Sequence, residues 1–197
     1  MSPRTFRSLG RSISVGDSGG FSELIRQCGE KAYNFAFRLS GNEQDARDLV
    51  SAAFVRAWEH FGSYETDKPF ESWLYKILHN IYLDEVRRYA HSHTVSLDAP
   101  APREETSWDE LLPGADPELD SGLLRREEDE MAQKALSSLP PHYRAAVALC
   151  DMEKLSYEEI SEIMSCPVGT VRSRVHQGRE LLRKAFAQLH KTGVKHP

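Results

Sequence analysis

Residues 156–186, SYEEISEIMSCPVGTVRSRVHQGRELLRKAF, decide the fold of the C-terminal part of the chain. They open with a Ser-x-x-Glu capping box, Ser156 to Glu159, whose hydroxyl and carboxylate satisfy free amides at the start of a helix. A tight turn then leads to Pro167, which favours the opening of a second helix because it has no amide hydrogen to lose. A capped short helix, a tight turn and a longer helix form the sequence pattern of a helix-turn-helix.

The second helix of this motif carries a basic face beside its packing face. The packing stripe consists of Val171, Val175, Gly178, Leu182, Ala185 and Leu189. A basic stripe follows it by one residue, about 100° around the helix axis. A helix-turn-helix inserts the start of its second helix into the DNA major groove, so early residues reach base edges and later cations reach phosphates. The predicted DNA contacts are Thr170, Arg172, Ser173, Arg174, His176, Gln177, Arg179, Arg183 and Lys184.

The charge of the chain is distributed unevenly. The 197 residues have a formal net charge of -5, yet residues 95–130 hold three Lys/Arg and twelve Asp/Glu, whereas residues 139–197 hold nine and six. The acidic segment has four prolines and no helical period, which predicts a linker with little packed structure. The C-terminal excess is modest for tight DNA binding, because affinity grows with the number of phosphates neutralised. A surface helix whose cations only meet solvent is the alternative.

The remaining helices follow from apolar residues spaced three and four apart. In the N-terminal part such stripes run from Phe21 to Leu39, from Ala46 to Phe61 and from Leu74 to about Tyr89. In the C-terminal part they run from about Leu119 to Ser138 and from His142 to Met152. No strand pattern occurs, so we expect an all-α fold of two small helical domains joined by the acidic linker. The predicted boundaries are 1–19 for a disordered extension, 20–92 and 119–190 for the domains, 93–118 for the linker and 191–197 for a tail.

Composition argues against several classes of protein. The chain has no long apolar run and no apolar signal segment behind its basic N-terminus, so we expect a cytoplasmic protein. Cys28, Cys150 and Cys166 are odd in number and lack C-x-x-C spacing, which favours structural thiols over disulfides or zinc ligands. His91 and His93 could reach one metal ion from an extended segment, but no third ligand is nearby. We therefore expect no metal and no other cofactor.

Two sets of short motifs carry a resemblance to a known family. The C-terminal set is Leu139-Pro-Pro-His-Tyr-Arg, Leu155-Ser-Tyr-Glu-Glu-Ile and Pro167-Val-Gly-Thr-Val-Arg-Ser-Arg-Val-His. The N-terminal set is Asp45-Ala46, Asp48-Leu49-Val50, Phe54, Ala57-Trp58, Phe70-Glu-Ser-Trp-Leu-Tyr-Lys-Ile, Asn80 and Asp84-Glu-Val-Arg-Arg. In this order they resemble region 4 and region 2 of bacterial RNA polymerase sigma factors of the extracytoplasmic-function (ECF) group, within the sigma-70 family.

The resemblance implies a factor that binds core RNA polymerase, directs it to promoters and promotes DNA melting, with no covalent reaction of its own. Region 2 of the family docks on the clamp coiled coil of the largest polymerase subunit, which implies core-binding roles for Asp45, Asp48, Leu49 and Arg56. It also holds the promoter minus-10 element as a single strand with a flipped base, which suits aromatic and amide side chains. The implied minus-10 residues are Tyr64, Phe70, Trp73, Lys76, Asn80, Arg87 and Arg88.

The resemblance extends to the linker, to regulation and to the minus-35 element. In the family the linker threads into the active-site cleft and RNA exit channel, although a solvated tether is the plain alternative. An anti-sigma factor is an expected partner. The helix-turn-helix would read the minus-35 element. Gln177 stands where many relatives carry Arg, and since Gln pairs with adenine while Arg prefers guanine, we predict a changed preference at one base.

Other interpretations stay open at this stage. Trp73 and Phe70 could be ordinary core residues, and Asp45 and Asp48 could only complement a helix start. A two-domain helix-turn-helix regulator that does not replace a sigma factor is the main alternative function. An enzyme using His91 and His93 is the alternative of another class, but no Gly-rich phosphate loop or H-E-x-x-H motif supports it.

Overall fold

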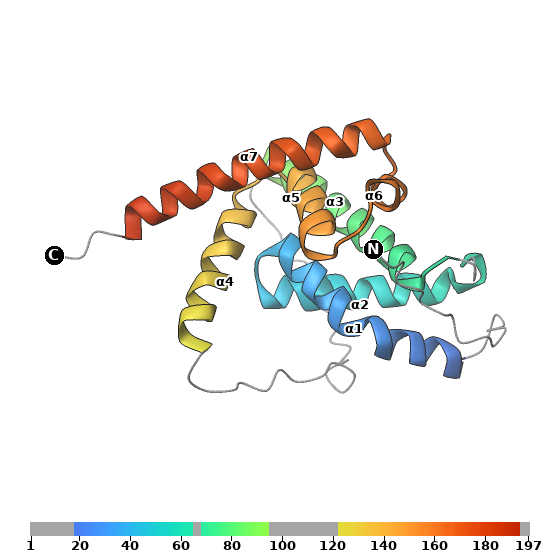
Figure 1. The fold of residues 1–197 in the computed structure, drawn as a ribbon. Coiled ribbons are helices and arrows are strands. Elements are labelled where there is room, and N and C mark those ends of the chain that lie inside the picture. Colours follow the sequence, from blue (N-terminus) through green and yellow to red (C-terminus); the bar gives the residue numbers. More distant parts are fainter. Residues whose placement is uncertain (1–17, 65–67, 95–121, 194–197) are drawn as a thin grey trace, which may run out of the picture.

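The computed structural model describes residues 18–64, 68–94 and 122–193, and every regular element in this part is helical (Figure 1). The α-helices are α1 Ser18–Ser40, α2 Glu43–Glu59, α3 Phe70–Thr94, α4 Gly122–Ser137, α5 Pro141–Val147, α6 Tyr157–Met164 and α7 Val168–Gly193. A 3-10 turn, η1 Phe61–Ser63, follows α2, and a π-helical turn, η2 Ala148–Met152, extends α5. The predicted all-α fold is confirmed.

Some helix boundaries differ from the prediction. Helix α3 continues to Thr94 because neither glycine nor proline interrupts the chain after Tyr89. His91 and His93 therefore belong to a helix, not to the extended segment that a two-histidine metal site would need. Helix α1 begins at Ser18, within the predicted extension, and α7 runs into the predicted tail. Residues 1–17, the linker from residue 95, the expected helix start at residues 119–121, and residues 194–197 lie outside the described part.

Helices α1, α2 and α3 pack around a common core. Phe35 and Leu39 of α1, Leu49 of α2, and Leu74 and Leu78 of α3 are each at most 1% exposed. These residues recur at spacings of three and four, so the apolar stripe of each helix faces the other two.

The turn between α1 and α2 is specified locally. Gly41 has a φ of +86°, in the left-handed region that ends helices and that glycine adopts without strain. Asn42 then accepts a hydrogen bond from the backbone amide of Asp45 at 2.8 Å and caps α2. The apolar stripe that the sequence predicts from Phe21 to Leu39 stops beside this turn, and the structure confirms the helix end.

The C-terminal helices form the predicted helix-turn-helix. The predicted capping box is present. The side chain of Ser156 accepts a hydrogen bond from the Glu159 amide, and the Glu159 carboxylate accepts one from the Ser156 amide. Helix α7 crosses α5 closely at Gly178, where an added Cβ would lie 2.5 Å from Cγ2 of Val147. Glycine at this position therefore permits the close crossing of α5 and α7.

The two sets of helices pack on each other. Helix α6 lies against α3, while α4 and α5 lie against α1, and α7 packs on α4, α5 and α6 (Figure 1). Buried apolar side chains of α1–α3 and of α5–α7 form one continuous cluster. Residues far apart in the sequence thus meet across a built interface between the N-terminal and C-terminal helices.

Candidate nucleic-acid interface

Helix α7 presents most of the predicted DNA contacts at its surface. Arg172, Ser173, His176, Gln177, Arg179 and Arg183 are exposed. Thr170 and Arg174 are half-buried. Val171 and Val175, the first two residues of the packing stripe, are buried against the other C-terminal helices. The predicted separation into a packing face and a basic face is therefore present on the first half of α7.

Four of these exposed side chains have partners within the chain, and one of them is Ser173, whose hydroxyl donates to the Thr170 carbonyl at 2.9 Å. Arg179 forms a two-pronged ion pair with Asp151, in which its Nε donates to Oδ2 at 2.9 Å, and this hydrogen bonding lowers the pKa of the carboxyl. Gln177 accepts a 2.6 Å hydrogen bond from the hydroxyl of Tyr143. Arg183 pairs with Glu180 at 2.6 Å. Base or phosphate contacts by these residues would therefore compete with, or be oriented by, contacts inside the protein.

Arg174 points away from the other cations of α7. Its guanidinium lies 3.5 Å from Sγ of Cys166 in the turn before α7. Its charge also lowers the pKa of His142 on α5 and of His79 on α3, in each case after the larger effect of burial. Arg174 therefore faces the junction between the two sets of helices, where a phosphate contact is harder to make than the sequence suggested.

An aromatic cavity lies at the start of α3. Tyr64, Phe70 and Trp73 pack with ring centroids 5.4–5.6 Å apart. Beside them is a cavity of about 240 Å³ lined by Ser63, Tyr64, Lys68, Ser72, Trp73, Lys76, Glu162 and Ile163. Phe70 is only 5% exposed and supports the ring cluster from within, whereas Tyr64 and Trp73 line the cavity. Two of the three predicted aromatic residues thus have surface available for a stacked base.

The polar residue buried on α3 is not the one that sequence reasoning selected. Asn80 is exposed, while its neighbour His79 is 2% exposed, and neither ring nitrogen has a hydrogen-bond partner of ordinary geometry. Burial lowers the pKa of His79 to about 4. Asn80 follows His79 by one residue, so it faces away from the side of α3 that packs.

The other predicted cations of α3 are exposed near its end. Arg87 pairs with Asp84 at 3.1 Å, and Arg88 donates to the Asp84 carbonyl at 3.4 Å. Lys76 is exposed beside the cavity. All three cations therefore lie where a nucleic-acid backbone could approach them.

The predicted polymerase-binding residues lie on α2. Asp45, Asp48 and Arg56 are exposed, but Leu49 is 1% exposed and belongs to the core. Burial raises the pKa of Glu85 on α3, and the charges of Asp45 and Asp48 raise it further. The two helices thus share an acidic surface, and Leu49 can act there only by supporting it.

Comparison with known proteins gives this arrangement a family. The Sigma-70 region 2 model matches residues 24–92, and the Sigma-70 region 4 model matches residues 129–182. The ECF RNA polymerase sigma factor SigW of Bacillus subtilis is 30% identical over 180 residues, which cover 91% of this chain and 95% of SigW. The chain is an ECF sigma factor. Its helices α1–α3 are called region 2 below, and α4–α7 are called region 4.

Further relatives agree with this assignment. The ECF RNA polymerase sigma factor SigE of Mycolicibacterium smegmatis is 40% identical over 168 residues, covering 85% of this chain but only 62% of SigE. The ECF RNA polymerase sigma-E factor of Escherichia coli is 33% identical over 181 residues, covering 90% of this chain and 92% of that relative.

Solved structures show the same fold. The sigma factor RpoE from Bartonella quintana, crystallised with the anti-sigma factor NepR, is 26% identical and covers 85% of this chain and 97% of RpoE, with a TM-score of 0.63. CnrH, solved with the cytosolic domain of CnrY, has a TM-score of 0.60 at 19% identity and covers 88% and 91% of the two chains. The latter likeness concerns the fold alone.

Sequence reasoning missed the polar residues that join the two regions of this sigma factor. Gln133 and Arg144 of region 4 donate to backbone carbonyls at the end of α1. The hydroxyl of Tyr75 in region 2 donates to Glu153 of region 4 at 2.6 Å. In the sequence, such contacts are indicated only by a polar residue at a core position, such as Gln133 next to the apolar stripe of α4. The sequence does not show which group that residue contacts.

The enzyme alternative would call for a metal site or for reactive thiols. Within them, no group of three or more His, Cys, Asp or Glu side chains could hold a metal ion. Cys28, Cys150 and Cys166 are free, and burial raises the pKa of the Cys28 thiol to about 11. No helix in this part of the sigma factor is long and apolar enough to cross a membrane.

Proposed function

We propose that this ECF sigma factor binds core RNA polymerase, directs it to promoters through minus-10 and minus-35 elements, and promotes DNA melting. The observation that carries the proposal is that one chain combines an aromatic cluster beside Lys68 and Lys76 in region 2 with an exposed basic face on the second helix of a helix-turn-helix in region 4. A regulator with a helix-turn-helix alone has no need of the first site. Covalent chemistry is left to the polymerase.

Region 2 would hold the minus-10 element as a single strand. Tyr64 and Trp73 offer ring surface for an unstacked base, and Phe70 keeps those rings in place from the core. Exposed Asn80 would contribute an edge hydrogen bond, while Lys76, Arg87 and Arg88 would meet the phosphates. Melting would follow because each base captured in the single strand is removed from the duplex.

Region 4 would read the minus-35 element in the major groove with the start of α7. Thr170, Arg172, Ser173, His176 and Gln177 lie within the first ten residues of α7. Arg179 and Arg183 would contact phosphates, while the half-buried Arg174 would do so only after turning outward. The modest positive charge of the helix fits a domain that binds tightly only as part of a polymerase.

Core polymerase would dock on the exposed acidic surface of α2, with Asp45, Asp48 and Arg56 in contact and Leu49 behind them. RpoE and CnrH were solved with NepR and with CnrY, and by analogy we propose an anti-sigma partner for this chain. The proposed domain division is 20–92 and 119–190, joined by an acidic linker that enters the polymerase cleft. This function places the protein in the cytoplasm.

Run-off transcription tests the proposal. Purified core polymerase is combined with this chain and a library of genomic fragments from its own host, and binding to core is followed by gel filtration. We expect transcripts that start only when the chain is present, at promoters that share two short elements. If no promoter-dependent transcript forms and no complex with core is found, the proposal is wrong.

Gln177 permits a sharper test of the minus-35 assignment. The hydroxyl of Tyr143 donates to the Gln177 side chain and thereby orients its amide. We expect Gln177→Arg to shift the preference at one minus-35 base from adenine toward guanine when promoters are selected from a randomised library. Tyr143→Phe is the control, since it removes only the orienting hydroxyl and should weaken the preference without changing the base. An unchanged preference in Gln177→Arg would remove Gln177 from the reading face.

A further inference from the structure

We propose that Lys154, in the loop that leads into α6, binds a backbone phosphate of the minus-35 DNA beside Arg179, and that Asp151 holds the two cations together. The inference deepens the proposed function and rests on it, because it extends the minus-35 surface from α7 onto the preceding loop. The ligand is the sugar-phosphate backbone, so the contact adds affinity at any sequence and reads no base.

The backbone at Lys154 is left-handed. The chain leaves η2 at Met152, and the Leu155 amide donates to the Leu149 carbonyl at 3.1 Å, which closes the turn. Within this turn Lys154 has a φ of +59°, a conformation that ends many helices and that glycine adopts without a steric cost from a Cβ. A lysine therefore makes the turn less stable than a glycine would, and its side chain needs another explanation.

Asp151 joins Lys154 to α7. Its backbone carbonyl accepts a hydrogen bond from Nζ of Lys154. Its carboxylate accepts from Nε of Arg179 at 2.9 Å and also from Nη2 of the same side chain. The backbone and the side chain of one residue thus hold two cations that come from different elements.

Both cations keep donors for an outside acceptor. Lys154 and Arg179 are exposed, and Lys154 directs one of its three ammonium protons at Asp151. Nε and Nη2 of Arg179 contact Asp151 and Cys150, whereas its Nη1 has no hydrogen-bond partner among the described residues. The Asp151 carboxylate offsets one of the two positive charges, and the remaining charge suits one phosphate contact.

The location suits the DNA backbone. Arg172 and Arg179 are seven residues apart on α7, or about two turns, so they share one face. In a helix-turn-helix the second helix enters the major groove and the first helix crosses the backbone. Lys154 stands two residues before Ser156, the N-cap of that first helix, and is tied through Asp151 to the second. It therefore lies where the strand that borders the groove would pass.

A cation that only stabilises a helix end is the competing explanation. Carbonyls at the end of a helix attract positive charge, and Nζ of Lys154 does donate to one of them. The two explanations predict opposite signs for the variant Lys154→Gly. If the lysine serves the turn, the variant loses stability. If the lysine serves DNA, the variant gains stability and loses affinity for DNA.

The salt dependence of promoter binding tests the contact. Holoenzyme is assembled from core polymerase and full-length wild type or Lys154→Gly, and it is bound to a promoter fragment that the wild type transcribes in the run-off test. We expect the slope of log K against log salt concentration to be smaller by about 0.9, the value for one phosphate contact, and the affinity at low salt to fall several-fold. The urea midpoint of the free variant should rise above that of the wild type.

Two variants are matched controls. Lys154→Arg keeps the charge and the strained backbone, so its slope and its urea midpoint should equal those of the wild type. Arg26→Gln removes one positive charge from an exposed position on α1 and should leave the slope unchanged.

Two results would overturn the inference while the proposed function stands. One is a slope for Lys154→Gly that equals the wild-type slope, which would mean that no phosphate contact is lost. The other is a lower urea midpoint for Lys154→Gly, which would mean that the lysine serves the helix end. If the wild-type holoenzyme gives no promoter-dependent transcript, the proposed function fails. The same salt series with the free full-length chain and a duplex of random sequence then decides whether Lys154 contacts a phosphate.

Discussion

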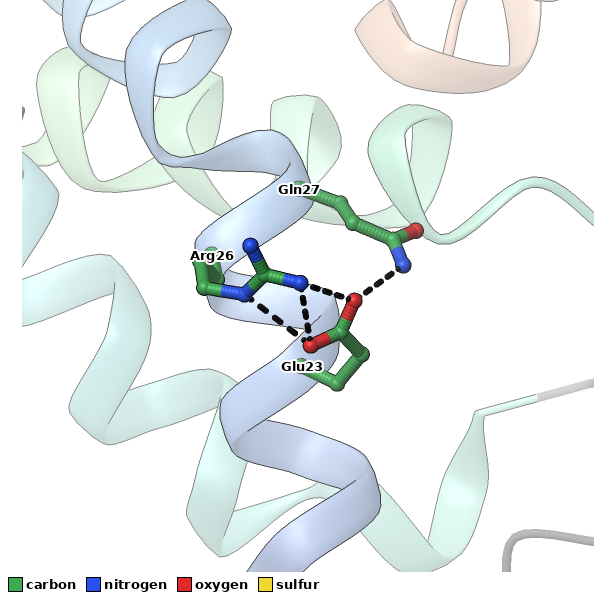
Figure 2. A network of polar contacts seen from close by, with 3 residues as sticks. All are labelled: Glu23, Arg26 and Gln27. Carbon is green, nitrogen blue, oxygen red and sulfur yellow. Dashed lines mark hydrogen bonds and ion pairs between the residues drawn. The ribbon is translucent and has the colours of Figure 1, made fainter.

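The two ends of helix α1 are held by different kinds of contact. Near its start, Glu23 accepts hydrogen bonds from Arg26 at 2.7 Å and from Gln27 at 2.7 Å (Figure 2). These three residues are three and four positions apart, so they lie within about one turn of the helix. At its end, backbone carbonyls accept from Gln133 and Arg144, which are about a hundred residues away in the chain.

The two networks should contribute differently to the stability of the chain. The Glu23 network is exposed and local, so salt and water screen it and it can form in an isolated helix. The contacts at the other end are part-buried and join region 4 to region 2. Breaking the second network should therefore lower the stability of the chain, while breaking the first should not.

The largest effect is expected from Arg144→Met. The substitution keeps the apolar stem but leaves carbonyls of Leu39, Ser137 and Leu139 without their donor. We expect the free energy of unfolding to fall by about 4 kcal/mol, since a half-buried charged group that donates to three carbonyls is lost. Urea denaturation followed by circular dichroism measures this, and Arg144→Lys should recover part of the loss. A fall under about 1 kcal/mol would show that the guanidinium is not needed.

A pH effect should follow from His79. Its pKa is lowered from 6.5 to about 4 by burial and by the charges of Arg174 and Arg87. The unfolded chain therefore binds more protons at this residue than the folded chain does. The free energy of unfolding should therefore keep its full value above pH 6.5 and fall by up to about 3 kcal/mol as the pH falls to about 4. Urea midpoints across this range measure the slope.

His79→Leu is the control for that slope, because it keeps the burial and removes the titration. Glu153 acts in the opposite sense, since burial raises its pKa and acid then favours the folded chain. If the stability of the wild type and of His79→Leu depends on pH in the same way between 6.5 and 4, His79 does not gain a proton on unfolding.

A smaller effect is expected from Gln133→Leu. The apolar side chain fits the buried position but removes the donor to the Arg38 carbonyl and leaves the Phe37 carbonyl with the Gly41 amide as its donor, at a cost of about 1–2 kcal/mol. Urea denaturation followed by circular dichroism measures this loss. A loss no larger than that of Glu23→Gln would mean that the Gln133 contacts do not stabilise the packing of the two regions.

The smallest effect is expected at the other end of α1. Glu23→Gln removes the charge that Arg26 and Gln27 contact, and hydrogen bonding by Arg26 lowers the pKa of that exposed carboxyl. We expect the midpoint of urea denaturation and the affinity for core to be unchanged within error. A loss as large as that of Gln133→Leu would mean that the two ends of α1 do not differ as described.

Contacts close together in the sequence were largely predictable. The capping box at Ser156 and the first half of the packing stripe of α7 each involve residues within one or two turns, and the structure confirms them. The register of α3 was predictable only for the face that packs within region 2. Its second face, which includes His79, is buried by region 4. The spacing of apolar residues in α3 does not indicate that region 4 packs there.

The candidate sites divide in the same way. Exposure of Arg172 and His176 follows from the helical period of α7 alone. The inward turn of Arg174, the pairing of Arg179 with Asp151 and the place of Glu162 beside the cavity depend on how distant helices meet. Such contacts cannot be derived from spacing, because the packing of the two regions determines them.

A distance measurement between the two regions tests the account most directly. Spin labels are placed at Glu30 of α1 and Ala187 of α7, both exposed, in a chain whose native cysteines are replaced by Ser. Pulsed electron paramagnetic resonance should give one narrow distance distribution for the free chain, because buried side chains of both regions share one core. A broad distribution would contradict the account, in which region 4 packs on region 2 through a built interface.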